Sequence, residues 1–293
     1  MQEMSPLVSV VCLSYNHESF VEKSLLSVLS QSFESFEIIF IDNNSSDKSF
    51  EVGESVLKKS HRRYHAIKQQ ENLGIAGGFN FGAKRIAKGK YIASLACDDW
   101  WDIDNLKYKV AFFEANPHYG MVYGNGYGFD DKTKEVTIFY KKPSISGKIL
   151  RDLLKAPNIN PQGILYKSDV LKEVDYWDQN AKVEDRDLWY RIAKHYEIGY
   201  VHEPLTFYRV HDNNISKRLD YMKEGNEYFF KKYEQEFPEE IALARKRQWQ
   251  FFAYHLATNA PGINSLKIMI KNYKFDWLYT KQIMKCILKM VKR

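Results

Sequence analysis

The alternation of apolar runs with amphipathic segments over the first half of the chain constrains the fold most strongly. The runs are rich in β-branched residues and predict strands, and the segments between them have helical spacing. Strands that alternate with helices form a mostly parallel sheet with helices on both faces, so we predict an α/β fold. The predicted strands are Leu7–Ser14, Phe36–Asp42, Tyr64–Gln69, Tyr91–Ala96 and Tyr119–Asn125, and the predicted helices are Phe20–Ser30, Asp47–Ser60, Ala76–Lys88 and Ile103–Asn116.

The second half of the chain is less regular. Phe129–Tyr140 indicates a hairpin, and Val183–His195 has the spacing of an amphipathic helix. Gly199–Val201 and Leu205–Val210 are typical of strands, and the pattern is helical from about Ser216 to the end. The 293 residues are enough for one well-buried α/β domain with a smaller helical addition.

Polar clusters stand directly after four of the predicted strands. Ligands of α/β sheets bind beyond the carboxyl ends of the strands, so the clusters are expected to converge on one rim. Each cluster by itself can be explained as a turn or a helix cap, because Asn and Asp favour both. Four clusters at strand ends together predict a binding site. They are Tyr15-Asn16, Asp42-Asn43-Asn44, Glu71-Asn72 and Asp98-Asp99.

Two adjacent carboxylates, Asp98 and Asp99, follow the apolar run Tyr91–Ala96. Their charges repel unless something positive lies beside them, and a hard divalent cation bound with substrate phosphates supplies that charge. The alternative is a helix N-cap with an acidic neighbour on the surface. The strand-end position favours the cation, which we expect to be Mn²⁺ or Mg²⁺.

A second acidic cluster, Glu184, Asp185 and Asp187, lies at the start of the predicted helix Val183–His195. Acidic side chains there interact favourably with the helix dipole, which is a sufficient structural explanation. A carboxylate near a substrate hydroxyl can also act as a general base that takes the proton of that hydroxyl as it attacks. The spacing by itself leaves both explanations open.

Arg209 lies in the predicted strand Leu205–Val210, and His211 follows that strand. If the alternation continues, the two side chains lie on one face. Arginine suits a diphosphate, and histidine can ligate a metal or donate a hydrogen bond. A solvated strand end is the alternative explanation.

The glycine-rich segment Asn72–Gly82 matches neither the dinucleotide fingerprint nor the P-loop. Its glycines allow a tight turn and close helix packing, while Asn72 and Asn80 can still face a ligand. The patterns of serine-triad hydrolases, zinc metalloproteases and nucleophile elbows do not occur.

Three cysteines, Cys12, Cys97 and Cys286, are too few and too far apart to indicate a disulfide framework or a zinc site. They fit a reducing cytoplasm. The N-terminal residues do not resemble a signal peptide, and no apolar stretch of about 18 residues predicts a membrane span. We therefore expect a cytoplasmic protein.

Four segments of the chain closely resemble, in order and spacing, the motifs of family 2 glycosyltransferases, which are inverting enzymes with the GT-A fold. The match covers about residues 6–216 and is specific for the family and the fold, but not for the sugar. The segments are VSVVCLSYNHESFVEKSLLSVLSQSFESFEIIFIDNNSSDKS, ENLGIAGGFNFGAKRIAKGKYIASLACDDWW, EDRDLWYRIA and FYRVHDNNIS.

The resemblance implies a GT-A, Rossmann-like α/β domain, with a mostly parallel sheet flanked by helices and a C-terminal helical extension. The catalytic domain is expected at residues 1–215. Its nucleotide-binding half is expected at about 1–125 and its acceptor half at about 126–215. Residues 216–293 are expected to form the helical extension.

The resemblance also implies a nucleotide site. Asp42 resembles the acid that hydrogen-bonds the uracil or other base, and Arg209 resembles a diphosphate contact. Many members have an aspartate that contacts the ribose where this chain has Ala96, so that contact must come from elsewhere. The other residues expected around the nucleotide are Tyr15, Asn16, Asn44, Asn72 and Asn80.

The reaction centre is assigned by the same resemblance. Asp185 resembles the general base. Asp98 resembles the aspartate that coordinates the metal, with Asp99 beside it, and His211 resembles a further metal contact. Glu184 and Trp100 are expected beside the acceptor or in support of the site.

The implied activity is transfer of a sugar from a nucleoside-diphosphate donor, expected to be a UDP-sugar, to a hydroxyl of a glycan or lipid-linked saccharide in surface-polysaccharide synthesis. We expect no nucleic acid partner, and the sequence leaves the oligomeric state open. A catalytically inactive nucleotide-sugar-binding protein is one alternative. Such a protein would lack the acid at position 98, at position 185 or at both, and this chain has Asp98 and Asp185. A nucleotidyltransferase is another, but Ser14–Ser19 lacks its usual glycine-rich basic loop.

Basic residues concentrate near the C-terminus, where Gly262–Arg293 holds seven Lys and one Arg against one Asp. Within residues 276–293, Lys281, Lys285 and Lys289 recur every four residues, and apolar side chains form another face. Such a helix can lie on an anionic membrane beside a lipid-linked acceptor, which would make the protein peripheral on the inner face of the membrane. Packing on the catalytic domain with solvated lysines is the alternative, and both remain open.

Overall fold

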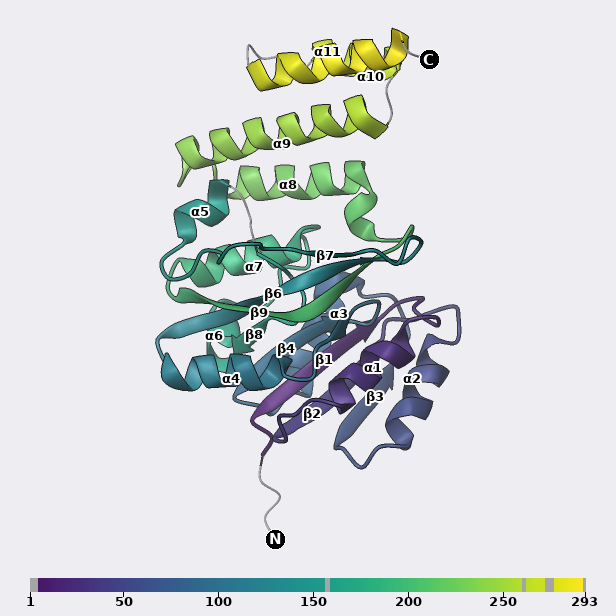
Figure 1. The fold of residues 1–293 in the computed structure, drawn as a ribbon. Helices are drawn as coiled ribbons and strands as arrows, with labels where there is room; N and C mark the ends of the chain where they lie inside the picture. Colours follow the sequence, from purple (N-terminus) through teal and green to yellow (C-terminus); the bar gives the residue numbers. More distant parts are fainter. Residues whose placement is uncertain (1–4, 156–158, 260–261, 272–276, 292–293) are drawn as a thin grey trace. The chain divides into compact units, whose positions relative to one another are not determined.

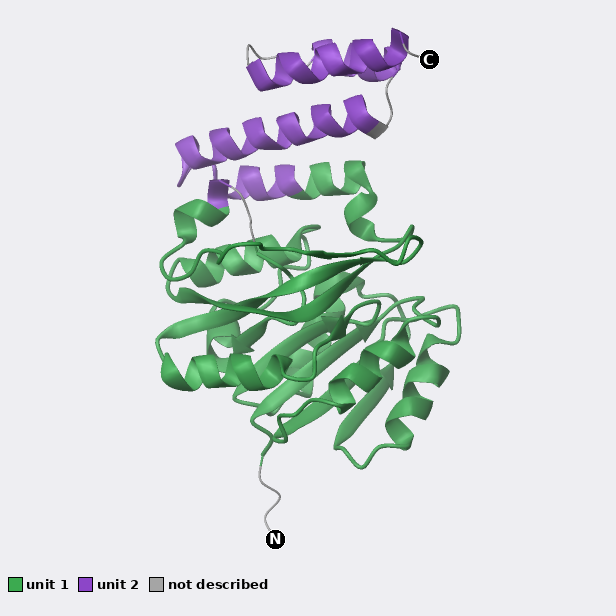
Figure 2. Cartoon of the chain, in the orientation of Figure 1, with its two compact units in different colours: residues 1–153, 157–225 green, residues 154–156, 226–293 purple. Residues whose placement is uncertain are grey.

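The computed structural model describes residues 5–155, 159–259, 262–271 and 277–291. The chain forms two compact units, which Figure 2 shows in green and purple. Unit 1 comprises residues 1–153 and 157–225, and unit 2 comprises residues 154–156 and 226–293. The division falls inside helix α8 (Leu219–Tyr233), later in the chain than the boundary expected after residue 215.

Unit 1 is built around a nine-stranded sheet (Figure 1). The strands are β1 Val8–Ser14, β2 Phe36–Asp42, β3 Tyr64–Lys68, β4 Tyr91–Ala96, β5 Trp100–Trp101, β6 Tyr119–Asp130, β7 Val136–Ile138, β8 Leu165–Lys167 and β9 Glu197–Val210. Their order in space is β3-β2-β1-β4-β8-β6-β9-β5, and β7 pairs with β6. The α/β fold is confirmed.

The first four strands in the chain are parallel, as predicted. Their register places Ser14 beside Asp42 and Leu13 beside Ala96, so the carboxyl ends of β1, β2 and β4 meet at one edge of the sheet. The polar residues that follow these strands therefore start from neighbouring positions, as ligand-binding residues of α/β sheets do.

Beyond β4 the sheet is mixed rather than parallel. β8 is antiparallel to both β4 and β6, β5 is antiparallel to β9, and β6 pairs with β9 in parallel. The sequence predicts neither β5 nor β8, because strands of two and three residues are too short to show an alternating pattern. These two strands bring antiparallel pairing into a sheet that the sequence predicts to be mostly parallel.

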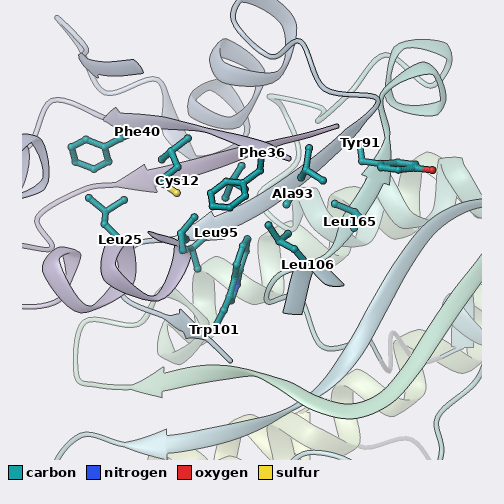
Figure 3. Close-up of a cluster of buried hydrophobic side chains, with 14 of the residues drawn as sticks. Cys12, Leu25, Phe36, Phe40, Tyr91, Ala93, Leu95, Trp101, Leu106 and Leu165 are labelled. Atoms are coloured by element: carbon teal, nitrogen blue, oxygen red, sulfur yellow. The ribbon is translucent and has the colours of Figure 1, made fainter. Parts of the chain in front are cut away.

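Helices cover both faces of the sheet, and the alternation of side chains along β1 shows why (Figure 1). Val10 and Cys12 of β1 belong to one buried cluster, which includes Leu25, and Val11 and Leu13 belong to another on the opposite face. Figure 3 shows part of the first cluster. The helices of this unit are α1 Val21–Leu29, α2 Ser49–Lys58, α3 Gly74–Arg85, α4 Asn105–Ala115, α6 Ser168–Glu173 and α7 Glu184–Ala193. The short helix α5, Leu150–Lys155, crosses the division between the units after Leu153.

Most predicted elements are confirmed, with ends that differ by a few residues. α3 ends at Arg85 rather than near Lys88, and the short helices α5 and α6 were not expected. The hairpin is confirmed, since Phe129 pairs with Val136. The two predicted strands Gly199–Val201 and Leu205–Val210 are one long strand, β9, because its pairing with β6 continues through register shifts.

The described residues after Ile215–Lys217 are mostly helical, as predicted. In unit 2, α9 Pro238–Asn259, α10 Ile263–Lys271 and α11 Trp277–Val291 follow α8. A separate buried cluster joins these three helices through Ala253, Ala257, Met269, Tyr279 and Cys286. Among the described residues, none of the helices has the length and apolar content needed to cross a lipid bilayer.

Candidate active site

Asp98 is the second residue after β4 and is the centre of a compact group of charged side chains. Its Oδ2 atom is 3.2 Å from Nε2 of His211 and 3.9 Å from Nε2 of His17. Burial alone would raise the pKa of Asp98, but the hydrogen bond with His211 and the nearby histidine charges outweigh it and lower the pKa. The structure therefore brings Asp98 and His211 together as expected, and it adds His17.

Asp99 has a different environment, although it is adjacent in sequence. Its Oδ1 accepts a 2.7 Å hydrogen bond from the backbone N–H of Arg209, which ties the end of β4 to β9. Burial and the neighbouring charge of Asp98 raise the pKa of Asp99 well above its ordinary value. The two carboxylates thus differ: Asp98 is held ionised by histidines, while Asp99 is buried against the backbone.

The side chain of Arg209 is buried beside this acidic pair. Its Nε donates to the backbone oxygen of Asp98 at 2.9 Å, and its Nη1 forms a 2.8 Å ion pair with Asp131. The guanidinium carbon lies 4.7 Å from the ring centres of both Phe20 and Trp100. Trp100 therefore supports the site through Arg209. The diphosphate contact expected of Arg209 remains a prediction.

Asp42, at the end of β2, is fully buried and tied to its own loop. Its Oδ1 and Oδ2 accept hydrogen bonds from the backbone N–H and the hydroxyl of Ser45, at 2.9 and 2.5 Å. The Ser45 hydroxyl also accepts a bond from the backbone of Asn16 at 2.9 Å. This network joins the loop after β2 to the loop after β1, where Tyr15 is exposed.

The asparagines expected at the nucleotide shape these loops. Asn16 and Asn44 have φ values of 56° and 64°, a left-handed conformation that asparagine tolerates better than most residues. The side chain of Asn43 bonds to Asn72 at 2.9 Å and to the backbone oxygen of Gly74 at 3.1 Å. The loops after β1, β2 and β3 are therefore connected, and nucleotide contacts by these residues remain predictions.

The acids of the second cluster lie in the first turn of α7. Burial, together with the charge of Asp185, raises the pKa of Glu184 to about 8, and burial raises the pKa of Asp185 to about 6. Nε1 of Trp177 donates to Oδ1 of Asp185 at 3.3 Å and opposes that rise. Burial thus moves the pKa of Asp185 towards neutral pH, which is the direction that suits a general base, and that role remains a prediction.

The side chain of Asn80 forms hydrogen bonds with the backbone of Trp177. The side-chain amide of Asn80 donates to the backbone oxygen of Trp177 at 2.8 Å and accepts from its backbone N–H at 3.1 Å. Both ends of the Asn80 amide are engaged by Trp177, so in this structure Asn80 supports the residue that contacts Asp185. Its expected nucleotide contact remains a prediction.

Sequence reasoning missed His17, Ser45 and Trp177 as members of the site, and it placed Asn43 in a strand-end cluster without giving it a role. His17 and Ser45 stand within the strand-end clusters or next to them, so their positions in the chain were a usable signal. Trp177 had none, because its contacts with Asn80 and Asp185 join three separate parts of the chain.

The residues around Asp98 fit a divalent cation. Oδ1 of Asp98 is buried and has no hydrogen-bond partner, and an imidazole of His211 stands beside the same carboxylate. The Oδ1 atom of Asp99 is already used by the backbone of Arg209, so the fit rests on Asp98 and His211. Within the described part of the chain, no three His, Cys, Asp or Glu side chains are arranged to hold a metal, so oxygens of a bound diphosphate would complete the coordination.

Comparison with known proteins identifies the family of the chain. Residues 9–175 match the family model described as glycosyl transferase family 2. The chain is 30% identical over 212 residues to the UDP-Glc:alpha-D-GlcNAc-diphosphoundecaprenol beta-1,3-glucosyltransferase of Escherichia coli. That similarity covers 72% of this chain and 80% of the relative.

Two solved structures share the fold. TarS of Staphylococcus aureus in complex with UDP-GlcNAc has a TM-score of 0.63 and 18% identity, over 95% of this chain and 79% of TarS. The mannosyltransferase PcManGT of Pyrobaculum calidifontis in complex with GDP-Man and Mn²⁺ has a TM-score of 0.64 and 15% identity, over 99% and 87%. These likenesses confirm the GT-A fold, and since the family model covers more than half of the chain, the protein belongs to glycosyl transferase family 2.

Proposed function

We propose that this glycosyltransferase moves a sugar from a UDP-sugar to a hydroxyl of a glycan or lipid-linked saccharide during surface-polysaccharide synthesis, with inversion at the anomeric carbon. The observation that carries the proposal is Asp185, a carboxylate whose pKa is raised to about 6 and which is oriented by Trp177. A group with this pKa is largely ionised at neutral pH and still basic enough to take a proton in the transition state.

In the proposed reaction, Asp185 accepts the proton of the acceptor hydroxyl. The hydroxyl oxygen forms a bond to the anomeric carbon from the face opposite the donor diphosphate. The bond between the anomeric carbon and the diphosphate oxygen breaks at the same time, and its electron pair leaves with the nucleoside diphosphate. The configuration of the sugar inverts because the attack and the departure occur on opposite faces.

The leaving diphosphate would lie near Asp98 and His211. A divalent cation held by these residues, Mn²⁺ or Mg²⁺, would supply positive charge there. The Mn²⁺ in the complex of the mannosyltransferase with the same fold supports this part of the proposal. Oδ1 of Asp98 supports it further, because a buried carboxylate oxygen without a hydrogen bond is suited to a cation.

The proposed donor and acceptor are inferred from proteins that are similar to this chain. The name of the Escherichia coli relative specifies UDP-glucose and a diphosphoundecaprenol-linked acceptor. TarS was solved with UDP-GlcNAc, whereas the mannosyltransferase was solved with GDP-Man. The 30% identity to the glucosyltransferase favours UDP and a lipid-linked saccharide for this chain, and with them a location at the inner face of the membrane.

The substitution Asp185→Asn tests the proposed base. It keeps the size of the side chain but removes its basicity, so we expect the rate of transfer to fall by about 10²–10⁴-fold. Binding of the donor, followed by thermal shift with UDP-sugars, should be nearly unchanged. Glu184→Gln is the comparison at the neighbouring carboxylate. Burial and the charge of Asp185 raise the pKa of Glu184, which favours its protonated form, so glutamine should cost less activity there than asparagine costs at Asp185.

The assay should measure both the released nucleoside diphosphate and pyrophosphate. Release of UDP or GDP with sugar transfer supports the proposal. Release of pyrophosphate would identify a nucleotidyltransferase, and binding of a nucleotide sugar without turnover would identify an inactive binding protein. Full activity of the Asp185→Asn enzyme would disprove the assignment of the base.

A further inference from the structure

The C-terminal helices of unit 2 bury one side of α11 and expose the other. Tyr279 and Cys286 of α11 are buried in the cluster shared with α9 and α10. The hydroxyl of Tyr279 donates to the backbone oxygen of Met269 in α10 at 3.0 Å, which fixes α11 against its neighbour. The side of α11 opposite Cys286 is therefore turned away from the core of unit 2.

That outward side is apolar. Trp277, Met284, Leu288 and Val291 are 73%, 53%, 57% and 79% exposed. At 100° per residue they fall within an arc of about 60°, centred opposite Cys286. We call these four side chains of α11 the outer face. On the neighbouring helix α10, Ile263 and Ile270 are exposed as well.

The lysines of α11 do not form the exposed face that their spacing predicts. Nζ of Lys289 donates to the backbone oxygen of Thr258 in α9 at 2.8 Å. Nζ of Lys285 lies 4.7 Å from the ring centre of Tyr254, also in α9. Two of the three lysines thus contact α9, and Lys281 is the one that is exposed beside the outer face.

Charge decides what can cover the outer face. Residues 262–293 carry seven Lys and one Arg with a single Asp, and Lys267 and Lys271 are exposed on α10 beside Ile270. A second copy of the chain would bring the same positive charges into contact, so self-association on this face is opposed. A surface with negative charges and an apolar interior satisfies both the lysines and the apolar side chains.

We propose that the outer face, with Lys267, Lys271 and Lys281, docks on the surface of a bilayer that contains anionic lipids. The helices α10 and α11 lie in the interfacial region, where Trp277 has the environment that tryptophan favours, and the lysines contact lipid phosphates. This inference deepens the proposed location beside a lipid-linked acceptor, but it concerns binding and not the reaction.

Sedimentation of the full chain with vesicles tests the proposal. Vesicles of phosphatidylcholine with phosphatidylglycerol are expected to bind the protein more strongly than phosphatidylcholine alone, and added salt should weaken the binding. The double substitution Met284→Glu with Leu288→Glu is expected to reduce binding about tenfold or more, because it removes apolar area and adds like charge. Leu26→Glu, at an exposed leucine of α1, is the matched control and should bind normally.

Two lysine substitutions distinguish the contribution of the exposed Lys281 from that of Lys285, which contacts α9. Lys281→Gln is expected to weaken binding about fivefold, the effect of one lysine near an anionic surface. Lys285→Gln should have a smaller effect, because Lys285 lies over Tyr254. Circular dichroism would confirm that each variant is folded, which is expected because the substituted outer-face side chains lie on the exposed side of α11.

Two outcomes would overturn the proposal. One is equal binding by wild type and the double variant. The other is a dimer, seen by light scattering, that the double variant loses while neither protein binds vesicles, since this would make the outer face a contact between copies. The vesicle assay contains neither donor nor acceptor, so its failure is distinct from a failure of the proposed transfer, which is measured by release of nucleoside diphosphate.

Discussion

At the scale of single residues, adjacent acids in this chain have different roles. Asp98 is contacted by two histidines, whereas Asp99 accepts a backbone hydrogen bond from β9. Asp185 is oriented by an indole, while the pKa of its neighbour Glu184 is raised to about 8. The tertiary environment of each carboxylate, rather than its place in a motif, sets its chemistry.

The pH dependence of the reaction follows from Asp185. Its pKa is raised to about 6, so the basic form prevails above pH 6 and is lost as the pH falls below it. We expect kcat to rise with pH through about 6 and then level off. A rate that stays constant from about pH 5 to 8 would contradict the role of Asp185.

Trp177→Phe should move this pH profile. The indole hydrogen bond favours the ionised form of Asp185, so its loss should raise the pKa and shift the acid limb of kcat to higher pH. Phenylalanine retains much of the ring packing against Phe79 and Tyr166. A merely structural role of Trp177 would lower stability without shifting the limb, and thermal unfolding measured beside the pH profile distinguishes the two.

Asp98 and Asp99 should respond differently to amide substitution. Asp98→Asn is expected to lower activity by about 10²-fold or more and to abolish its dependence on Mn²⁺ or Mg²⁺, because it removes the charge that fits a cation. Asp99→Asn retains an oxygen that can accept the Arg209 N–H, so it should lose less activity. Metal titrations of both variants check this, and wild-type activity in excess chelator would argue against a catalytic cation.

At the scale of secondary-structure elements, the close approach of α3 to the sheet depends on glycine. A Cβ atom added at Gly82 would lie 2.7 Å from Cγ1 of Val11 and 2.9 Å from Cδ1 of Ile41. Val11 and Ile41 belong to neighbouring strands, β1 and β2, so the helix packs over both. Gly82 therefore serves helix packing, while Gly74 has a φ of 70° in the turn before the helix, so both roles that the sequence indicates for these glycines occur.

Gly82→Ala should therefore destabilise unit 1 by about 1–3 kcal/mol through overpacking. Urea unfolding followed by circular dichroism measures this loss. Gly262→Ala is the control, because a Cβ atom there would meet nothing within 4 Å. Equal stability of the two variants would show that α3 can move away from the sheet at little cost.

At the scale of the whole molecule, the predicted site residues lie in unit 1, which holds the sheet, and unit 2 has its own core. A donor that binds at Asp42 and Asp98 should stabilise unit 1 in particular. UDP-sugar and Mn²⁺ should increase the free energy of unfolding of unit 1 by about 2.7 kcal/mol when the ligand is at a hundredfold excess over Kd. Calorimetry of the full chain measures this as a higher unfolding temperature for unit 1. A larger effect of GDP-sugars would revise the expected base.

Periodicity in the sequence by itself determined most of the fold. The apolar runs and helical spacing identified β1 to β4, β6 and α1 to α4, because these elements bury a regular stripe or face. The strand-end acids Asp42 and Asp98 and the helix-start acid Asp185 were also visible, since their positions at element ends are local features. The family motifs then indicated the fold and the class of reaction.

Only the tertiary structure decided how these residues are used. The bond from Arg209 to Asp99 joins residues 110 positions apart, and the bonds between Asn80 and Trp177 span 97 positions. The inward lysines of α11 depend likewise on its packing against α9. Local sequence determines the pattern of an element, but the partner of a side chain depends on register and packing between distant elements, which the local pattern does not contain.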